Sequence, residues 1–228
     1  MSFVNVAENL ETIQANIRQA CDRAGRSNNE ISVIAVTKYV TIDRAKQAIE
    51  AGVEHLGENR VEGMNEKYDE IGQGVQWHFI GTLQSRKVKE VIDQVSMIHS
   101  LDRKSLAKEI NKRTDRKVPC FVQVNVSGED SKHGLEPEEV IPFIDSLRNY
   151  ENIEVTGLMT MAPYIEDQDK LRSIFRKLRT IKEEVETKDW AHAPCKHLSM
   201  GMSNDYEIAI EEGATHIRIG SKLVGKEF

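Results

Sequence analysis

The chain has 228 residues, of which 39% are hydrophobic and 30% are charged, a balance typical of a folded globular protein rather than a disordered one. Its 37 acidic and 31 basic residues give a formal net charge of −6. This charge disfavours a nucleic-acid-binding surface, because neutralisation of phosphates by basic side chains supplies much of that affinity. No apolar run approaches the ~18 residues of a membrane span, and the first residues lack the pattern of a secretory signal. We therefore expect neither nucleic acid nor a membrane as a partner.

The cysteines and histidines indicate neither a disulfide framework nor a metal site. An odd number of cysteines without a C-x-x-C pair favours free thiols and a reducing cytoplasm; the three are Cys21, Cys120 and Cys195. His192, Cys195 and His197 are potential zinc ligands, but their short span includes a proline and is typical of a loop that enters a strand. We predict no metal there and leave the role of this cluster open.

The chain opens with an amphipathic segment, Val4–Ala24, whose apolar residues recur at helical spacing before Gly25. Short apolar runs then alternate with longer helical patterns, as in βα units around a parallel sheet. The expected strands are Ile31–Lys38, His55–Asn59, Val75–Gly81, Ser96–Leu101, Pro119–Val126, Ile153–Met161, His197–Ser203 and His216–Gly220. The expected helices lie near residues 42–51, 61–71, 85–93, 103–114, 137–149, 167–187 and 205–212.

Eight strands joined by seven helices predict one domain over residues 1–228, a closed (β/α)₈ TIM barrel. The alternative is a doubly wound open sheet, which usually carries a glycine-rich loop after its first strand. The segment Val36–Val40 has no glycine, which favours the barrel. After Gly220 too few residues remain for an eighth helix, so we expect the extra opening helix to cover the wall there.

Active sites of such barrels lie at the carboxyl ends of the strands. Lys38 ends the first predicted strand on the same face as Ile34 and Val36, because side chains alternate along a strand. Burial favours a neutral amine, the form that makes a Schiff base with an aldehyde. The alternative is a lysine at the rim whose stem packs while its ammonium reaches water.

The last predicted strand ends in Arg218-Ile219-Gly220-Ser221. Glycine lets the backbone approach a ligand closely, and the N–H groups near Gly220 and Ser221 suit a phosphate. Barrels often bind phosphate in the loops after strands 7 and 8, and the preceding strand adds the hydroxyls of Ser199 and Ser203 at the same corner. Together these residues predict a phosphate site.

Motifs from the first strand to the last resemble the pyridoxal phosphate homeostasis protein family, whose fold is similar to the N-terminal barrel of alanine racemase. The matching stretches are Ala35-Val36-Thr37-Lys38, Gly57-Glu58-Asn59, His78-Phe79-Ile80-Gly81 with Leu83-Gln84, Gly157-Leu158-Met159-Thr160-Met161, Leu198-Ser199-Met200-Gly201-Met202-Ser203 followed by Asp205, and Arg218-Ile219-Gly220. They run in order along nearly the whole chain.

This resemblance implies that Lys38 holds pyridoxal 5′-phosphate (PLP) as a Schiff base. It implies that Ser203 and the backbone of Gly220 and Ser221 hold the phosphate, with Arg218 against the pyridine nitrogen. The further lining residues that the resemblance implies are Asn59, His78, Ser199 and Met200.

An always-charged guanidinium at position 218 cannot accept the pyridine proton, so the ring would stabilise carbanions poorly. Alanine racemases also use a second base from a C-terminal domain, and we expect none in this chain. The resemblance therefore favours a monomeric, cytoplasmic PLP-binding protein of vitamin B6 homeostasis and amino-acid balance, without robust catalysis. The alternatives are a weak amino-acid racemase or other PLP-dependent enzyme acting on amino acids, and a barrel for a different phosphorylated metabolite in which Lys38 is only a cation.

Overall fold

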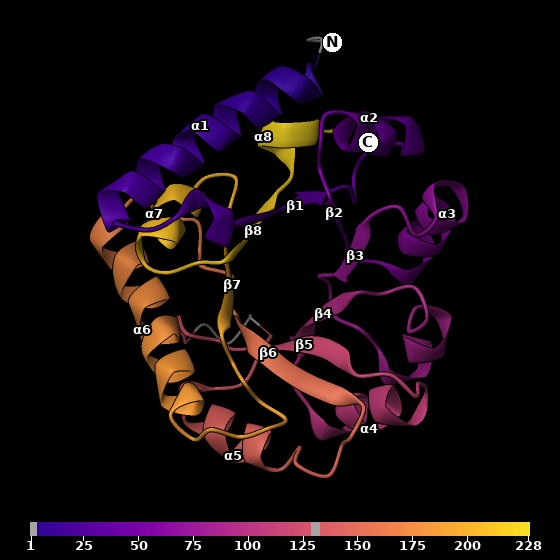
Figure 1. Cartoon of the computed structure of the whole chain (residues 1–228), viewed down its shortest axis with the longest axis vertical. Coiled ribbons are helices and arrows are strands. Elements are labelled where there is room, and N and C mark those ends of the chain that lie inside the picture. Colours follow the sequence, from indigo (N-terminus) through magenta and orange to yellow (C-terminus); the bar gives the residue numbers. More distant parts are fainter. Residues whose placement is uncertain (1–3, 129–132) are drawn as a thin grey trace.

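The computed structural model describes residues 4–128 and 133–228. Eight parallel strands close into a barrel in chain order, each paired with the next and β8 paired with β1, and helices surround them (Figure 1). The predicted (β/α)₈ barrel is confirmed. The strands are β1 (Ser32–Val36), β2 (His55–Glu58), β3 (Gln76–Phe79), β4 (Met97–Leu101), β5 (Val118–Gln123), β6 (Ile153–Met159), β7 (His197–Met202) and β8 (His216–Ile219).

The helices follow the predicted order with two local differences. The helix expected near 85–93 is a short 3₁₀ helix, Ser85–Glu90, and the one expected near 137–149 is a 3₁₀ turn that leads into a short α-helix. Along the described residues no helix has the length and apolar character needed to cross a membrane. The α-helices are α1 (Val6–Ala24), α2 (Ile42–Glu50), α3 (Val61–Ile71), α4 (Lys104–Lys112), α5 (Val140–Asp145), α6 (Gln168–Glu186), α7 (Tyr206–Glu211) and α8 (Ser221–Val224).

The opening helix α1 lies along the outer wall beside α7 and the four-residue α8 (Figure 1). The Asn16 amide donates to the Tyr206 hydroxyl at 2.9 Å, and the Asn9 amide donates to the Leu223 carbonyl at 2.9 Å. The buried stripe of α1 contains Val6, Leu10, Ile13, Ile17, Ala20 and Cys21. This helix therefore covers the wall that the short α8 leaves bare, as the sequence predicted.

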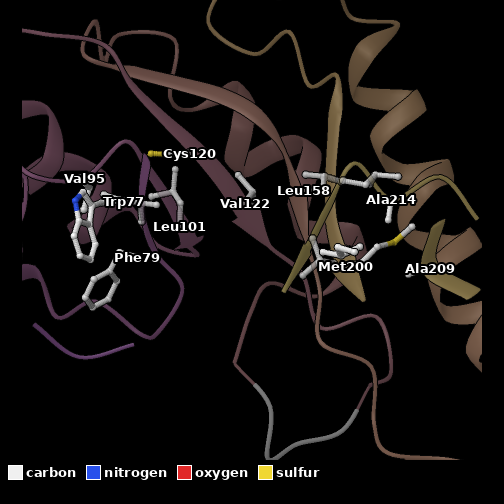
Figure 2. Packing of buried hydrophobic residues seen from close by; sticks show 14 of the residues in the cluster. Trp77, Phe79, Val95, Leu101, Cys120, Val122, Leu158, Met200, Ala209 and Ala214 are labelled. Carbon is white, nitrogen blue, oxygen red and sulfur yellow. The ribbon is translucent and has the colours of Figure 1, made fainter. Parts of the chain in front are cut away.

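Two different layers form on the two sides of the sheet. Outside, strand and helix side chains build an apolar layer that includes Trp77, Phe79, Leu158 and Met200 (Figure 2). Inside, ring contacts join Phe121 to His99 at 4.5 Å and to His216 at 5.1 Å between centroids. The barrel interior thus holds imidazole rings where aliphatic side chains usually pack.

Candidate functional site

A cavity of about 520 Å³ opens at the carboxyl ends of the strands. It brings together six of the nine residues that the sequence singled out, namely Lys38, Asn59, Ser203, Arg218, Gly220 and Ser221. The other described residues that line it include Val36, Tyr39, Ile80, Gly81, Thr82, Gln123, Met161, Ala162, Pro163, Tyr164, Met202, Asn204, Asp205, Gly225 and Lys226. Its position is the one at which barrels of this kind bind ligands.

Lys38 lies in a turn just after β1. The strand ends at Val36, two residues earlier than predicted, and the Thr37 carbonyl accepts from the Val40 N–H at 3.2 Å, which closes a turn over Lys38. The Thr37 hydroxyl donates to the Glu58 carboxylate at 2.6 Å, and this carboxylate also pairs with the Lys67 ammonium at 3.0 Å. Glu58 and Lys67 are both buried, so a fixed polar pair holds the residue that precedes Lys38.

The Lys38 side chain is half-buried, and its Nζ lies 4.7 Å from the centroid of the Tyr39 ring. Among the described residues no carboxylate lies within ion-pair distance of that nitrogen. Val36 and Lys38 both line the cavity, as the alternation along the strand predicted. The amine is therefore available to a ligand in the cavity.

Arg218 forms the buried polar end of the cavity. Its Nη2 donates to the Thr160 carbonyl at 2.9 Å, and its Nη1 donates to the Ser199 hydroxyl. Burial lowers the pKa of the guanidinium to about 10, and the nearby Asp205 carboxylate raises it in part. Because this pKa is still well above neutrality, Arg218 presents donors and a positive charge, and no acceptor, to the cavity.

The corner between β7 and β8 gathers hydroxyl and backbone groups. Ser203 and Asn204 come from the turn after β7, and Gly220 and Ser221 come from the start of α8. A Cβ on Gly220 would meet Val36 only at ordinary contact distance, 3.6 Å. Hydroxyls, backbone N–H groups and the Lys38 amine around one cavity are a donor set that suits a phosphorylated aldehyde.

Three predicted residues lie away from the cavity wall. Ser199 points into the barrel beneath Arg218, and His78 lies further inside, in contact with His99. Met200 points the opposite way, because it follows Ser199 on the strand, and packs with the apolar layer near Ala209 (Figure 2). The structure therefore places Ser199 and His78 behind the site and Met200 outside the barrel.

The C-terminal tail contributes residues that the sequence did not single out. The Glu227 N–H donates to the Tyr39 carbonyl at 3.0 Å, and the Glu227 carboxylate accepts from the Thr41 N–H at 2.7 Å. Arg44 links this tail to the segment before α1, since it donates to the Val4 carbonyl at 3.0 Å and pairs with Glu227 at 3.3 Å. The tail therefore reaches the cavity through contacts that no local pattern encodes.

The cluster near residue 195 has other partners. The His192 ring contacts the Ile144 carbonyl at 2.9 Å, and burial raises the pKa of the Cys195 thiol to about 12. Within residues 4–128 and 133–228 no group of three or more histidine, cysteine or acidic side chains is arranged to hold a metal ion.

Comparisons with known proteins identify the family. A model of the alanine racemase N-terminal domain matches residues 9–227. The chain is 41% identical over 227 residues to the pyridoxal phosphate homeostasis protein of Aquifex aeolicus, covering 98% of this chain and 99% of that protein. An unknown protein from Bifidobacterium adolescentis superposes with a TM-score of 0.91 at 30% identity, covering 96% of this chain and 94% of that chain. PipY of Synechococcus elongatus, solved with PLP bound, superposes with a TM-score of 0.83 at 28% identity, covering 96% and 100%. The chain therefore belongs to the pyridoxal phosphate homeostasis protein family, built on the fold of the alanine racemase N-terminal domain.

Proposed function

We propose that this protein binds PLP covalently through the Lys38 amine and serves intracellular PLP homeostasis. The observation that carries the proposal is one cavity lined by Lys38, by Arg218, and by Ser203 and Ser221 at the corner between β7 and β8. An amine attaches the aldehyde, while hydroxyls and N–H groups bind the phosphate. The similar PipY protein was solved with PLP bound, which supports the same ligand here.

Arg218 favours binding over turnover. When bound, PLP supplies an electron sink whose strength depends on a protonated pyridine nitrogen. A guanidinium donates hydrogen bonds and accepts none, so it leaves this nitrogen unprotonated. We therefore propose that the protein binds PLP and releases it to amino acids, and that it does not racemise these amino acids.

We also propose that the protein acts in the cytoplasm and as a monomer. The thiols of Cys21, Cys120 and Cys195 are free and buried, which supports a reducing cytoplasm. The large apolar side chains that are exposed in the described chain are few, namely Tyr39, Met161, Tyr164 and Phe228. Three of them border the cavity, which supports a single domain, residues 1–228, that acts as a monomer.

The test is a visible spectrum of the protein with added PLP, followed by borohydride reduction and peptide mapping. We expect an absorbance band that bleaches on reduction, with the added mass on Lys38. Lys38→Ala should remove the band while the fold persists, and Lys226→Ala is the matched control, because Lys226 also lines the cavity. A protein that stays colourless, or a mass on another lysine, would overturn the assignment.

A further inference from the structure

Histidines are concentrated inside the barrel. Of the seven in the chain, five lie in ring contact with one another or with Phe121, at centroid distances from 4.5 to 6.4 Å. They are His55, His78, His99, His197 and His216. A polar interior of this kind is costly unless its groups are hydrogen-bonded.

Three of these rings form one continuous hydrogen-bonded chain that starts at the cavity. The Ser199 hydroxyl, which accepts from Arg218, lies 2.8 Å from Nδ1 of His99. The Nε2 atom of His99 lies 2.9 Å from Nδ1 of His78, and Nε2 of His78 lies 2.9 Å from Nδ1 of His55. His55 is the first residue of β2, so the chain crosses the barrel from the cavity to the opposite end.

Arg218 determines which way the protons in this chain point. Its guanidinium is only a donor, so the Ser199 hydroxyl turns a lone pair towards it and cannot donate to it. Within the described residues the other hydrogen-bond partner of this hydroxyl is His99. The hydroxyl proton therefore points to Nδ1 of His99. If Nδ1 of His99 donated to Ser199 instead, the buried proton of the Ser199 hydroxyl would have no acceptor.

Each ring then fixes the tautomer of the next ring. A neutral imidazole carries one N–H and one lone pair. If Nδ1 of His99 accepts, its Nε2 carries the proton and donates to Nδ1 of His78, and His78 in turn donates from Nε2 to His55. Burial lowers the pKa of His78 and His99 well below the usual value and lowers the pKa of His55, which is consistent with three neutral rings.

We propose that Ser199 and His99 are positioning residues for Arg218, and that the guanidinium sets His99, His78 and His55 as neutral Nε2–H tautomers. The chain keeps a lone pair of the Ser199 hydroxyl facing Nη1, and the Thr160 carbonyl holds Nη2. The remaining guanidinium donors are then fixed relative to the cavity. The order of the tautomers depends only on the protein's own side chains, and only its effect on bound PLP rests on the proposed function.

The first test uses the full-length protein labelled with ¹⁵N-histidine, without PLP, at pH 7.5. Long-range ¹H–¹⁵N correlation spectra distinguish Nδ1–H, Nε2–H and doubly protonated rings, and single His→Gln variants assign them. We expect Nε2–H tautomers at His55, His78 and His99. An Nδ1–H tautomer or a doubly protonated ring at His78 or His99 would overturn the proposal.

Ser199→Ala tests the link to Arg218. This variant should shift the Nδ1 resonance of His99 and shift the absorbance band of bound PLP. Ser100→Ala is the matched control, because Ser100 is a buried neighbour of His99 whose hydroxyl has no hydrogen-bond partner in the described part of the chain. Unchanged His99 resonances in Ser199→Ala would refute the positioning role. If the tautomers are ordered but no PLP binds, the proposed function fails and this inference stands.

Discussion

The Thr37 hydroxyl and the Glu58 carboxylate, 2.6 Å apart, join the turn that carries Lys38 to the outer face of β2. Glu58 points away from the barrel, where Lys67 of α3 pairs with it and a Cβ on Gly63 would come within 3.2 Å of its carboxylate. The lysine turn is therefore held from outside the barrel by a buried ion pair.

Replacing this carboxylate should destabilise the protein and slow PLP attachment. Glu58→Gln leaves the Lys67 ammonium buried without a charge partner, which costs about 3 kcal/mol of unfolding free energy. Urea denaturation measures this loss, and the rate at which the PLP absorbance band appears measures the effect on Lys38. The double variant Glu58→Gln/Lys67→Met should recover most of the stability. If the double variant is as unstable as the single one, the buried charge is not the cause.

The histidine interior should make the barrel sensitive to acid. Burial lowers the pKa of His216 to about 3 and lowers those of His78 and His99, whereas the unfolded chain binds these protons near pH 6.5. Stability is therefore complete above about pH 6.5 and falls as pH decreases towards 3, by about 1.4 kcal/mol per pH unit for each proton. Urea midpoints measured between pH 7.5 and 4.5 give the slope. His216→Phe should reduce this slope, because it removes a buried imidazole whose pKa is lowered in the folded state.

The opening helix should be essential for a stable barrel. Leu10 lies in the buried stripe of α1, and Leu10→Ala should cost about 2 to 5 kcal/mol, the usual range for a leucine removed from a core. Glu11→Ala, at the adjacent exposed position, should change little. Deleting α1 should abolish cooperative unfolding. A truncated protein with the melting temperature of the full chain would show that α1 is dispensable.

Arg218 should limit the reactivity of bound PLP. If Arg218 faces the pyridine nitrogen as proposed, Arg218→Glu would put a carboxylate there that stabilises the protonated nitrogen, and should raise the exchange of the alanine α-hydrogen in deuterium oxide. Arg218→Gln removes the positive charge without adding a carboxylate and should raise this exchange less. Equal exchange rates in the two variants and the parent protein would contradict the electronic role of this residue.

Most of the fold was predictable because it is encoded locally. Apolar runs such as Ile31–Val36 predict strands buried on both faces, and alternation placed Val36 and Lys38 on one side. The end of β1 was predicted two residues late, since the Thr37 carbonyl closes a turn with the Val40 N–H while its hydroxyl bonds to Glu58 on the next strand. Local patterns do not contain such contacts.

The site was predictable only in part for the same reason. Lys38, Arg218 and Gly220 follow from their positions at strand ends, but His99 gains its role from the barrel closing, which brings Ser199 from β7 against it. Tyr39 and Lys226 meet at the cavity because the tail folds back. The alternation that places His78 inside the barrel could have indicated His99 on the neighbouring strand.

Arg44 joins the first and last segments of the described chain, since its guanidinium binds the backbone of Val4 and the carboxylate of Glu227. The same Glu227 is bonded to Tyr39 and Thr41, on the segment that follows Lys38. A displacement of Glu227 would therefore break bonds to the backbone on the far side of the lysine turn, so the position of the tail and the position of Lys38 are coupled.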